Sequence, residues 1–344
     1  MTTFLEQEIY SQPEAVAQLL DREAERVGQI VAQLPACDYA LIAARGTSDH
    51  AAIYAKYAWA ALAGLPVALA TPSLHTLYAA PPRMNGALVV GVSQSGQSPD
   101  IVSVLEEGKR QGRPTLTITN DGASPLATTA DHVIEIHAGP ERSVAATKTY
   151  TTQLAVMALL AAAWSGQPER LAELRRVPEA LTATLAGAAD IARRAERYRY
   201  MDQCVVISRG YNYATALELA LKLKELTYVQ AVAYSSADFR HGPIATISAG
   251  LPAILIMPSG AAFDDMLDLA RDLHDRGAEL LIAGDDATAD PLATTLLRLA
   301  GGLPEWLSPL AAIVPGQLLA LHLTLAKGFD PDRPRGLRKV TRTL

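Results

Sequence analysis

Short apolar runs alternate with helical patterns along most of the chain. The runs that predict buried strands cover residues 39–44, 87–92, 113–119, 203–208, 253–257 and 279–283. A continuous apolar run bounded by turn residues is typical of a strand that is covered on both faces. Strands that alternate with amphipathic helices predict parallel sheets between layers of helices. We therefore predict an α/β fold with two tandem, doubly wound parallel sheets.

Landmarks in the first half of the chain recur in the second half at a constant spacing. Gly46 and Gly210 each follow an apolar run and an arginine, and they are 164 residues apart. Gly96 and Gly260 each follow a serine after an apolar run, and they are also 164 residues apart. This repeat predicts two copies of one domain. In doubly wound sheets, ligands bind where the carboxyl ends of strands meet helix N-termini.

The segments outside the two repeats have different patterns. Apolar residues at helical spacing predict a helical arm at the start of the chain. Ala, Arg and Glu around Pro168 and Pro178 indicate a helical connector, whereas prolines and glycines after residue 328 indicate an extended tail. The expected order is helical arm 1–34, first domain 35–165, connector 166–194, second domain 195–327 and tail 328–344.

Composition narrows the class of protein. A chain of 344 residues, 49% hydrophobic and 19% charged, is long enough for two domains with buried cores. The net charge is −6 and no cluster of five or more basic residues occurs, so we expect no nucleic acid partner.

The same sequence contains no clear sign of a membrane segment or a metal site. The longest apolar stretch, residues 154–164, is shorter than the roughly 20 residues that cross a bilayer. With no signal-peptide pattern after Met1, we expect a cytoplasmic protein without a membrane partner. Cys37 and Cys204 lack CxxC spacing, and the histidines show no metal-ligand pattern, so we expect neither disulfides nor a bound metal.

Three serines lie between a predicted strand and a predicted helix. Residues 93–98, Ser-Gln-Ser-Gly-Gln-Ser, form what we call the serine loop, and Pro99 opens the helix. A helix N-terminus presents unpaired N–H groups and a partial positive charge, to which hydroxyls add neutral donors. The alternative is a turn in which Ser98 is the N-cap and Pro99 the first helical residue. Capping accounts for Ser98 but not for Ser93 or Ser95, which favours a phosphate site.

A second turn with hydroxyl groups follows the first predicted strand. Gly46 permits a tight turn, and Thr47 and Ser48 can cap the next helix or bind a ligand. Taken alone, this turn indicates a helix cap. Because it lies at the same sheet edge as the serine loop, it can form the second wall of one pocket.

Two further places carry titratable groups. Lys222 and Glu225 are three residues apart in a predicted helix, which by itself indicates a surface ion pair. His241, followed by Gly242 and Pro243, is expected in a loop, where a histidine can carry a proton near neutral pH.

Six motifs, in this order, carry a resemblance to a known family. They are Arg-Gly-Thr-Ser at 45–48, the serine loop, residues 138–148, Leu-Lys-Leu-Lys-Glu at 221–225, Arg-His-Gly-Pro at 240–243 and Pro-Arg-Gly-Leu-Arg-Lys at 334–339. Together they resemble the sugar isomerase (SIS) family, and within it the isomerase half of the glucosamine-6-phosphate synthases and their stand-alone relatives. The resemblance covers nearly the whole chain and implies two tandem SIS domains.

The resemblance implies a site for a sugar phosphate and no cofactor. The substrate-binding residues that it implies are Gly46, Thr47, Ser48, Ser93, Gln94, Ser95, Ser98, Val144 and Ala145. It assigns Glu225 to move a proton between C1 and C2 of the sugar. His241, contributed by the neighbouring subunit of a homodimer, would help to open the ring. Lys339 can form an imine with an open-chain ketose phosphate or orient the substrate.

The chain departs from the family pattern at several positions. Ala146 stands where the family has a hydroxyl, Ala237-Asp238 replaces Gly-Glu before the histidine, and Val232 replaces an acidic residue. No glutamine-hydrolysing domain precedes the first repeat, so the resemblance implies an enzyme without glutaminase activity. These departures agree with the stand-alone deaminases and deglycases of the family.

The expected reaction converts glucosamine 6-phosphate to fructose 6-phosphate and ammonia by aldose–ketose isomerisation. The alternatives are a deglycase for fructosamine 6-phosphate, an isomerase for galactosamine or tagatose derivatives, and a sugar-phosphate sensor without catalysis. Sensors with this fold carry a helix-turn-helix domain and usually one SIS unit, whereas the repeat in this chain indicates two.

Overall fold

Two parallel sheets of five strands each form the framework of the protein. The structure, a computed structural model, describes residues 2–339, so the end of the predicted tail, residues 340–344, lies outside the described residues. The first sheet contains β1 (Tyr39–Ala43), β2 (Val67–Leu69), β3 (Ala87–Ser93), β4 (Thr115–Thr119) and β5 (His132–Glu135). The second contains β6 (Gln203–Ser208), β7 (Gln230–Ser235), β8 (Pro252–Ile256), β9 (Glu279–Gly284) and β10 (Thr295–Arg298).

The two sheets have the same topology. Their strand orders are β2-β1-β3-β4-β5 and β7-β6-β8-β9-β10, with every neighbouring pair parallel. Adding five to each strand number of the first order gives the second order, which confirms the repeat expected from the sequence. In each sheet the order reverses beside the first strand of the repeat, which makes the edge after β1 and β3 a site where ligands bind in such folds.

The chain divides into two compact units that are not continuous in sequence. Within the described residues, the first-sheet unit comprises residues 14–141, 148–175 and 338–339, and the second-sheet unit comprises residues 2–13, 142–147 and 176–337. The helical arm expected at 1–34 consists of α1 (Phe4–Tyr10) and α2 (Gln12–Gln33). The first of these helices belongs to the second-sheet unit, and nearly all of the second belongs to the first-sheet unit.

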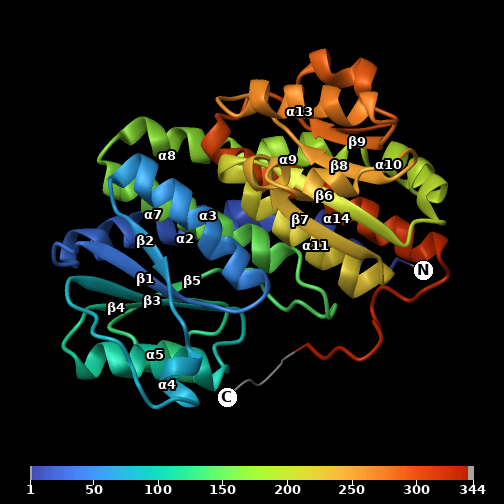
Figure 1. Cartoon of the computed structure of the whole chain (residues 1–344). Helices are drawn as coiled ribbons and strands as arrows, with labels where there is room; N and C mark the ends of the chain where they lie inside the picture. The colour runs from blue at the N-terminus through green and yellow to red at the C-terminus, as the bar shows by residue number, and fades with distance from the viewer. Residues whose placement is uncertain (1, 340–344) are drawn as a thin grey trace. The chain divides into compact units, whose positions relative to one another are not determined.

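Helices cover both faces of the first sheet (Figure 1). On one side lies α5 (Pro99–Arg110), which contacts α4 (Ser73–Thr76) and α6 (Pro125–Thr129). On the other side lies α3 (Thr47–Ala63), which packs on α7 (Lys148–Ser165). Helix α8 (Pro168–Leu174) follows α7 in the chain. Ile101, Val104 and Leu105 of α5 pack on Val89 of β3 because helical spacing places them on one face. The Trp59 indole N–H donates to the Met157 carbonyl at 2.9 Å and joins α3 to α7.

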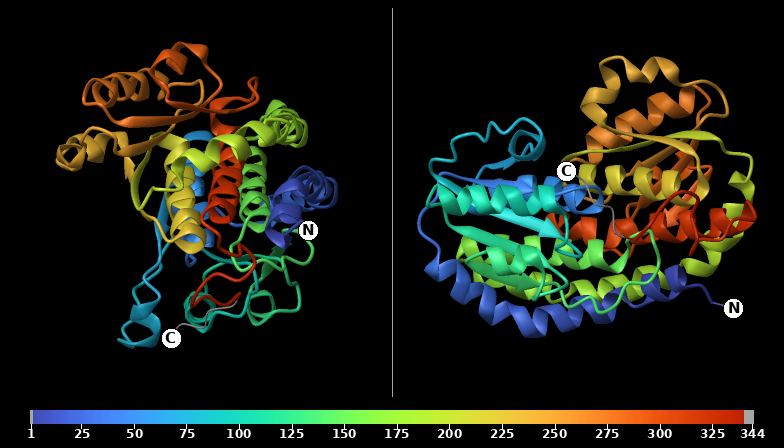
Figure 2. Two further views of the ribbon diagram at one scale, coloured as in Figure 1. Left: turned by 90° about the vertical axis from the view of Figure 1, so that its right-hand side faces the viewer. Right: turned by 90° about the horizontal axis from the view of Figure 1, so that it is seen from below.

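The second sheet has a similar arrangement. One face is covered by α12 (Ser236–Arg240) and α13 (Phe263–Asp275), whose Met266, Leu269 and Leu273 join the core with Leu255 of β8. On the other face α11 (Tyr213–Thr227) and α14 (Ser308–Ala326) lie side by side, coloured yellow and red in Figure 2. The helices α1, α9 (Val177–Leu185) and α10 (Ala188–Ala195) contact α14.

Five short 3₁₀ turns complete the second-sheet unit in the described chain. They are η1 (Glu196–Tyr198), η2 (Gly210–Asn212), η3 (Pro243–Thr246), η4 (Ala287–Leu292) and η5 (Glu305–Leu307).

One helical segment of the described chain is both long and largely apolar. It comprises the 22 residues Glu305–Ala326, and an apolar window within it has a mean hydropathy of 1.5. By length and composition alone it could cross a membrane, but 83% of its apolar window is buried inside the protein. Such burial is what the core helix of a globular domain shows.

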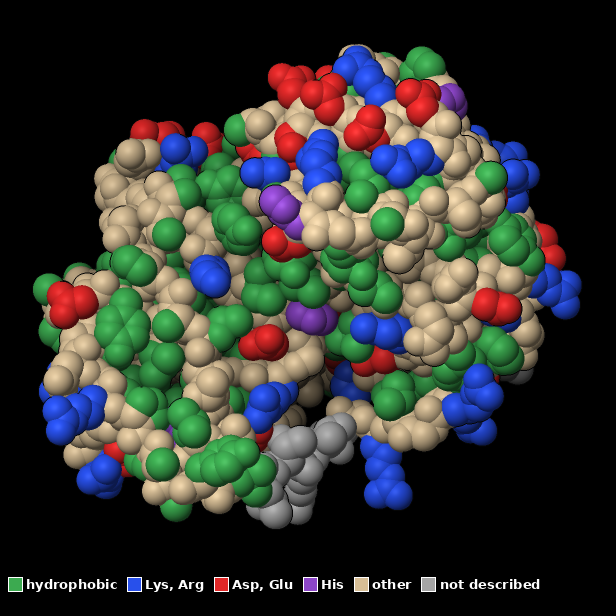
Figure 3. Space-filling view, viewed as in Figure 1, with side chains coloured by type: hydrophobic (Ala, Val, Ile, Leu, Met, Phe, Trp, Pro, Cys, Tyr) green, Lys and Arg blue, Asp and Glu red, His purple; other side chains and the backbone are tan. Residues whose placement is uncertain are grey.

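The surface carries charges of both signs. On the face shown in Figure 3, lysine and arginine side chains alternate with aspartate and glutamate, without a continuous basic patch. This mixture agrees with the modest net charge of −6.

Candidate active site

The serine loop begins where β3 ends, and two of its hydroxyls brace its own backbone. Ser93 Oγ accepts the N–H of Gly96 at 3.1 Å, and Ser95 Oγ accepts the N–H of Gln97 at 3.3 Å. A hydroxyl that accepts a hydrogen bond keeps its own proton to donate. The loop is therefore held in shape by the same serines that can bind an anion.

Gly96 is the one position in this loop that excludes a side chain. Its φ of +61° lies in the left-handed region, and a Cβ there would overlap the side chain of Ser124, the N-cap of α6. The Gly96 carbonyl accepts the N–H of Leu126 at 3.1 Å, which ties the loop to α6. Half-buried Gln94 is tied on the other side, because its carbonyl accepts the N–H of Asn120 at 3.1 Å.

The N-terminus of α5 follows the loop as expected. Ser98 is the N-cap of α5 and Pro99 is the first helical residue, so the capping alternative is correct for the backbone. The Ser98 hydroxyl makes no capping hydrogen bond, however. The Ser98 hydroxyl is therefore not used to cap the helix.

The turn after β1 differs from the expectation that its hydroxyls cap a helix. Gly46 itself is the N-cap of α3, with φ +53° and ψ −127°, and Thr47 and Ser48 are the first two helical residues. The cap interpretation was wrong because this backbone conformation is open only to glycine. Ser48 is buried at the start of α3, and its Oγ accepts a hydrogen bond from Gln153 Nε2 of α7 at 3.0 Å.

An ion pair that sequence analysis did not identify joins the two walls. Arg45 Nε lies 2.8 Å from Asp100 Oδ2, and the Asp100 side chain is fully buried at the start of α5. Strands β1 and β3 are neighbours, so the turn at Gly46 and the serine loop lie at one sheet edge. Two features of the sequence indicate this pair. An arginine follows one predicted strand, and an aspartate lies in the first turn of the helix that follows the neighbouring strand.

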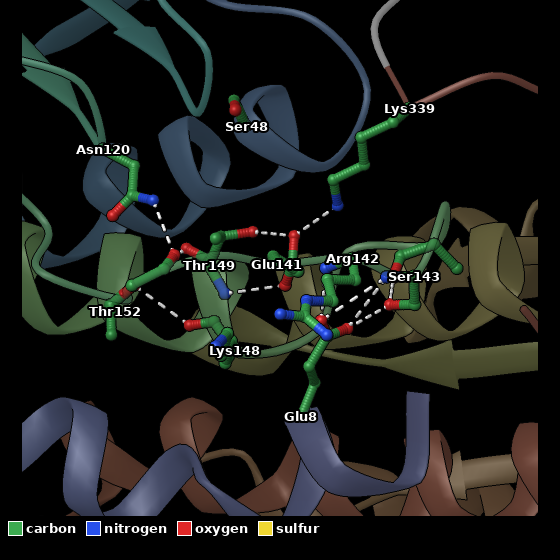
Figure 4. A network of polar contacts seen from close by, with 12 residues as sticks. Glu8, Ser48, Asn120, Glu141, Arg142, Ser143, Lys148, Thr149, Thr152 and Lys339 are labelled. Atoms are coloured by element: carbon green, nitrogen blue, oxygen red, sulfur yellow. Dashed lines mark hydrogen bonds and ion pairs between the residues drawn. The ribbon is translucent and has the colours of Figure 1, made fainter. Parts of the chain in front are cut away.

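Lys339 contacts a buried carboxylate in the first-sheet unit (Figure 4). Its ammonium lies 2.6 Å from Glu141 Oε2, and the side-chain exposures are 26% for Lys339 and 0% for Glu141. Glu141 also accepts the N–H of Thr149 at 3.1 Å and its hydroxyl at 2.7 Å. Glu141 belongs to one of the six motifs, but sequence analysis assigned it no role.

In the second-sheet unit, α11 holds a buried charge cluster. Lys222, with 1% of its side chain exposed, lies 2.6 Å from Glu225 Oε2 and 3.3 Å from Glu218 Oε1. The expectation of a surface ion pair was wrong, because Glu218 one turn earlier faces the same buried side. Burial alone would lower the pKa of Lys222, but the carboxylates of Glu218 and Glu225 outweigh it and raise that pKa. Glu225 is 22% exposed and is the member of the cluster that reaches the surface.

His241 is exposed and lies in a turn, but the segment before it is a helix and not a loop. Residues 236–240 form α12, capped by Ser235, whose Oγ accepts the Asp238 N–H at 3.1 Å. The cap was missed because a serine between polar residues also fits a loop. Arg240 anchors this turn, with its guanidinium 2.9 Å from Asp265 Oδ1 on α13.

Val144 and Ala145 lie in the segment 142–147 of the second-sheet unit. Val144 is half-buried and Ala145 is buried. The Ala145 carbonyl oxygen lies 2.9 Å from Ser143 Oγ.

Comparison with known proteins decides the family. The model of the SIS domain matches residues 34–163 and 199–326. The chain belongs to the SIS family. The two matched segments contain β1–β5 and β6–β10, so this SIS protein has two domains of the family, as the resemblance implied.

The relatives of this SIS protein include synthases and isomerases. Glutamine–fructose-6-phosphate aminotransferase (isomerizing) of Pyrococcus horikoshii is 36% identical over 343 residues, which are 98% of this chain and 57% of that protein. The C-terminal domain of glucosamine-fructose-6-phosphate aminotransferase from Francisella tularensis has a TM-score of 0.87 and 28% identity, with 97% of this chain and 99% of that one covered. An inferred phosphosugar isomerase of Silicibacter pomeroyi has a TM-score of 0.86 and 35% identity, with 96% and 100% covered. The chain thus spans a little over half the length of the synthase.

The predicted site residues of the SIS protein fall into two sets. The first-sheet unit holds the turn at Gly46, the serine loop and Lys339, and the second-sheet unit holds Glu225, His241 and the segment with Val144 and Ala145. Among residues 2–339, no group of three or more His, Cys, Asp or Glu side chains is placed to bind a metal ion.

Proposed function

We propose that this SIS protein is a phosphosugar isomerase that converts glucosamine 6-phosphate to fructose 6-phosphate and ammonia. The observation that carries the proposal is the serine loop, with its hydroxyls at the N-terminus of a helix of 12 residues. The named activities of relatives that are 36% and 35% identical support the class of reaction. The sequence departures at Ala146, Ala237 and Val232 favour a stand-alone deaminase within that class.

The phosphate would bind through neutral donors at one end of the site. Ser93, Ser95 and Ser98 offer hydroxyl protons, and the first turn of α5 offers backbone N–H groups. Thr47 at the start of α3 supplies a further hydroxyl from the second wall. These donors bind the phosphate without a positively charged side chain, and the helix macrodipole adds attraction.

The isomerisation would use one carboxylate to move one proton. After His241 helps to open the ring, the Glu225 carboxylate takes the proton from C2, and the C1 aldehyde oxygen takes a proton from water and becomes the hydroxyl of an enolamine. Glu225 then returns its proton to C1 and the amine nitrogen releases one proton to water, which gives the 2-imine of fructose 6-phosphate. Water adds to the imine carbon, and ammonia leaves. Glucosamine 6-phosphate and water thereby become fructose 6-phosphate and ammonia.

The buried ammonium of Lys222 holds the Glu225 carboxylate in place for this task, because Lys222 Nζ lies 2.6 Å from Glu225 Oε2. Lys339 supplies an amine that can form an imine with the open-chain ketose, once its contact with Glu141 is released.

The decisive experiment measures both products. Purified protein is given glucosamine 6-phosphate, and ammonia and fructose 6-phosphate are followed in parallel, with Glu225→Gln as the test variant and exposed Glu179→Gln on α9 as the control. We expect equal amounts of the two products from the wild type and the control, and none from Glu225→Gln, which should still bind the sugar phosphate. An active Glu225→Gln variant would contradict the mechanism.

A second candidate reaction is favoured by the missing hydroxyl at Ala146. This half-buried position lies next to Ala145 in the implied sugar pocket, so a different sugar or a fructosamine 6-phosphate could fit. Binding of glucosamine 6-phosphate without ammonia release would favour that deglycase or an isomerase for galactosamine or tagatose derivatives. Binding of all these phosphosugars without turnover of any would favour a sensor.

We also propose a cytoplasmic homodimer in which His241 acts in the partner's site. The exposure of His241 leaves it available for such a role. Inactive His241→Ala and Glu225→Gln variants are refolded together to form mixed dimers. A shared site predicts recovery of about a quarter of wild-type activity, since half of the dimers are mixed and each has one intact site. No recovery would contradict the shared site.

A further inference from the structure

The first helix of the chain carries a buried carboxylate that no part of the proposed reaction uses. Glu8 of α1 is 5% exposed, and its carboxylate accepts the backbone N–H groups of Arg142 and Ser143 (Figure 4). The distance from Ser143 N to Glu8 Oε2 is 3.3 Å, and Ser143 Oγ donates to the same oxygen. Hydrogen bonds to a charged acceptor are about twice as strong as neutral ones.

These contacts reach the segment that holds two implied substrate-binding residues. Ser143 is fully buried, and its Oγ, besides contacting Glu8, lies 2.9 Å from the carbonyl oxygen of Ala145. The single hydroxyl proton of Ser143 is thus shared between two acceptors, the Glu8 carboxylate and the Ala145 carbonyl. The conformation of Val144, between them, is set from both ends.

Helix α1 is itself fixed at both ends within the second-sheet unit. At its start, the Asp332 carboxylate accepts the N–H groups of Phe4 at 2.8 Å and Leu5 at 2.9 Å, which are unpaired donors of a first helical turn. Just beyond its end, Gln12 Nε2 donates to Gln317 Oε1 of α14 at 2.8 Å. Glu8 therefore projects from a helix that cannot shift without breaking these contacts.

We propose that Glu8 is a positioning residue that sets the backbone of Val144 and Ala145 for binding of the sugar phosphate. The inference rests on the proposed function. A buried charge is costly, and a neutral side chain would fill this space at lower cost, so core packing alone does not account for a carboxylate here. A carboxylate does account for two backbone N–H groups and one hydroxyl that converge on it. Asp332 contributes indirectly, since it holds α1 in place.

The test compares two charge-neutralising variants on the same helix. Glu8→Gln removes the charge and keeps the size, and Glu6→Gln is the matched control because its side chain lies two residues away in α1. Hydrogen exchange of the peptide that contains Arg142 and Ser143 reports on the segment, and calorimetric titration with fructose 6-phosphate reports on affinity. For Glu8→Gln we expect faster exchange and a roughly tenfold weaker affinity, with little change in Glu6→Gln.

The outcomes separate this inference from the proposed function. Wild-type protein that binds no sugar phosphate would overturn both. Faster exchange in Glu8→Gln with unchanged affinity would overturn only the positioning role, and so would equal effects of Glu6→Gln and Glu8→Gln. Under the proposal, KM rises much more than kcat falls, and Glu8→Asp restores part of the affinity. If Glu8→Gln does not fold, Ser143→Ala, which removes the shared hydroxyl, must weaken affinity in the same way or the inference fails.

Discussion

Lys339 Nζ lies 2.6 Å from Oε2 of Glu141, a side chain with 0% exposure. The same carboxylate accepts two hydrogen bonds from Thr149 at the start of α7. A tail lysine therefore satisfies a buried charge at the end of a loop of the first-sheet unit. The contact holds the amine that the resemblance assigns to imine formation against this carboxylate.

We predict that Glu141→Gln lowers the capture of a ketose phosphate by Lys339. The amide keeps the size of the side chain but loses the charge that holds the ammonium, so the tail loses its anchor and the amine its position. Borohydride reduction in the presence of fructose 6-phosphate, followed by peptide mass spectrometry, should show roughly tenfold less labelled Lys339 than in the wild type.

Two variants control this measurement. Lys339→Arg keeps the ion pair but cannot form an imine, so it must show no label at position 339. Glu106→Gln neutralises an exposed carboxylate on α5 and should label like the wild type. Equal or stronger labelling in Glu141→Gln would contradict the anchoring role.

We predict that Gly96→Ala in the serine loop lowers the free energy of unfolding far more than Gly64→Ala at the end of α3. Gly96 has φ +61° and a Cβ there would overlap the side chain of Ser124, whereas Gly64 at the end of α3 has φ +65° and open space around it. Gly64→Ala should cost about 1 kcal/mol of unfolding free energy for the left-handed backbone alone. Gly96→Ala should cost about 2 kcal/mol more, because α6 or the loop must move.

The two glycine variants are compared by urea unfolding and by titration with fructose 6-phosphate. Only Gly96→Ala should weaken binding, since only it displaces Ser93 and Ser95. Equal unfolding midpoints and equal affinities for the two variants would show that the loop adapts to the extra carbon.

Much of the fold could be predicted because it depends on local pattern. Buried parallel strands are continuous apolar runs, and the constant spacing of Gly46 and Gly210 shows the repeat without any three-dimensional information. Register, strand order and the division into two discontinuous units depend on contacts between distant residues. The placement of α1 with the second sheet, through Asp332 and Gln317, has no local signal.

The candidate site shows the same limit. The serine loop is visible in the sequence because strand, hydroxyls and helix are contiguous. The partners of the charged groups are not visible in the sequence. Glu141 and Lys339 are separated by almost 200 residues, and Arg45 lies in the turn after β1 whereas Asp100 lies in α5. Lys222 looked exposed because the burial of α11 comes from tertiary packing, which helical spacing alone does not show.

We predict that Arg45→Met weakens both stability and binding. The variant leaves the fully buried Asp100 carboxylate without its 2.8 Å partner at the start of α5. Loss of one partner of a buried pair costs about 3–5 kcal/mol, but half of the Arg45 side chain is exposed, so we expect a loss of roughly 2 kcal/mol in unfolding free energy. Exposed Arg83→Met is the control. Urea unfolding measures the stability of both variants. An unchanged free energy of unfolding for Arg45→Met would show that water replaces the guanidinium.

The Asp265 carboxylate supports the turn at His241, and we predict that this support depends on pH. The carboxylate of Asp265 in α13 lies 2.9 Å from Nη1 of Arg240 and 3.3 Å from Nη1 of Arg209. It also accepts a hydrogen bond from the Ser236 hydroxyl. Burial alone would raise the pKa of Asp265, but the hydrogen bond from Ser236 and the two guanidinium groups outweigh it and hold that pKa below its ordinary value. A carboxyl whose pKa is lower in the folded state stabilises the fold above the unfolded pKa, about 3.9 for aspartate, and loses that effect as the pH falls through the folded value.

Asp265→Asn should therefore be less stable than the wild type at pH 7, and the difference should shrink below about pH 4 and vanish once the wild-type carboxyl is protonated. Urea unfolding at several pH values measures this difference. Asp268→Asn on the same helix is the matched control, because Asp268 forms an exposed ion pair with Arg271 that contributes little to stability. Activity should fall in Asp265→Asn and not in Asp268→Asn, since only the first releases Arg240 beside His241. A stability difference that is constant from pH 7 to pH 3, or equal activity in the two variants, would show that Asp265 does not hold this turn through its charge.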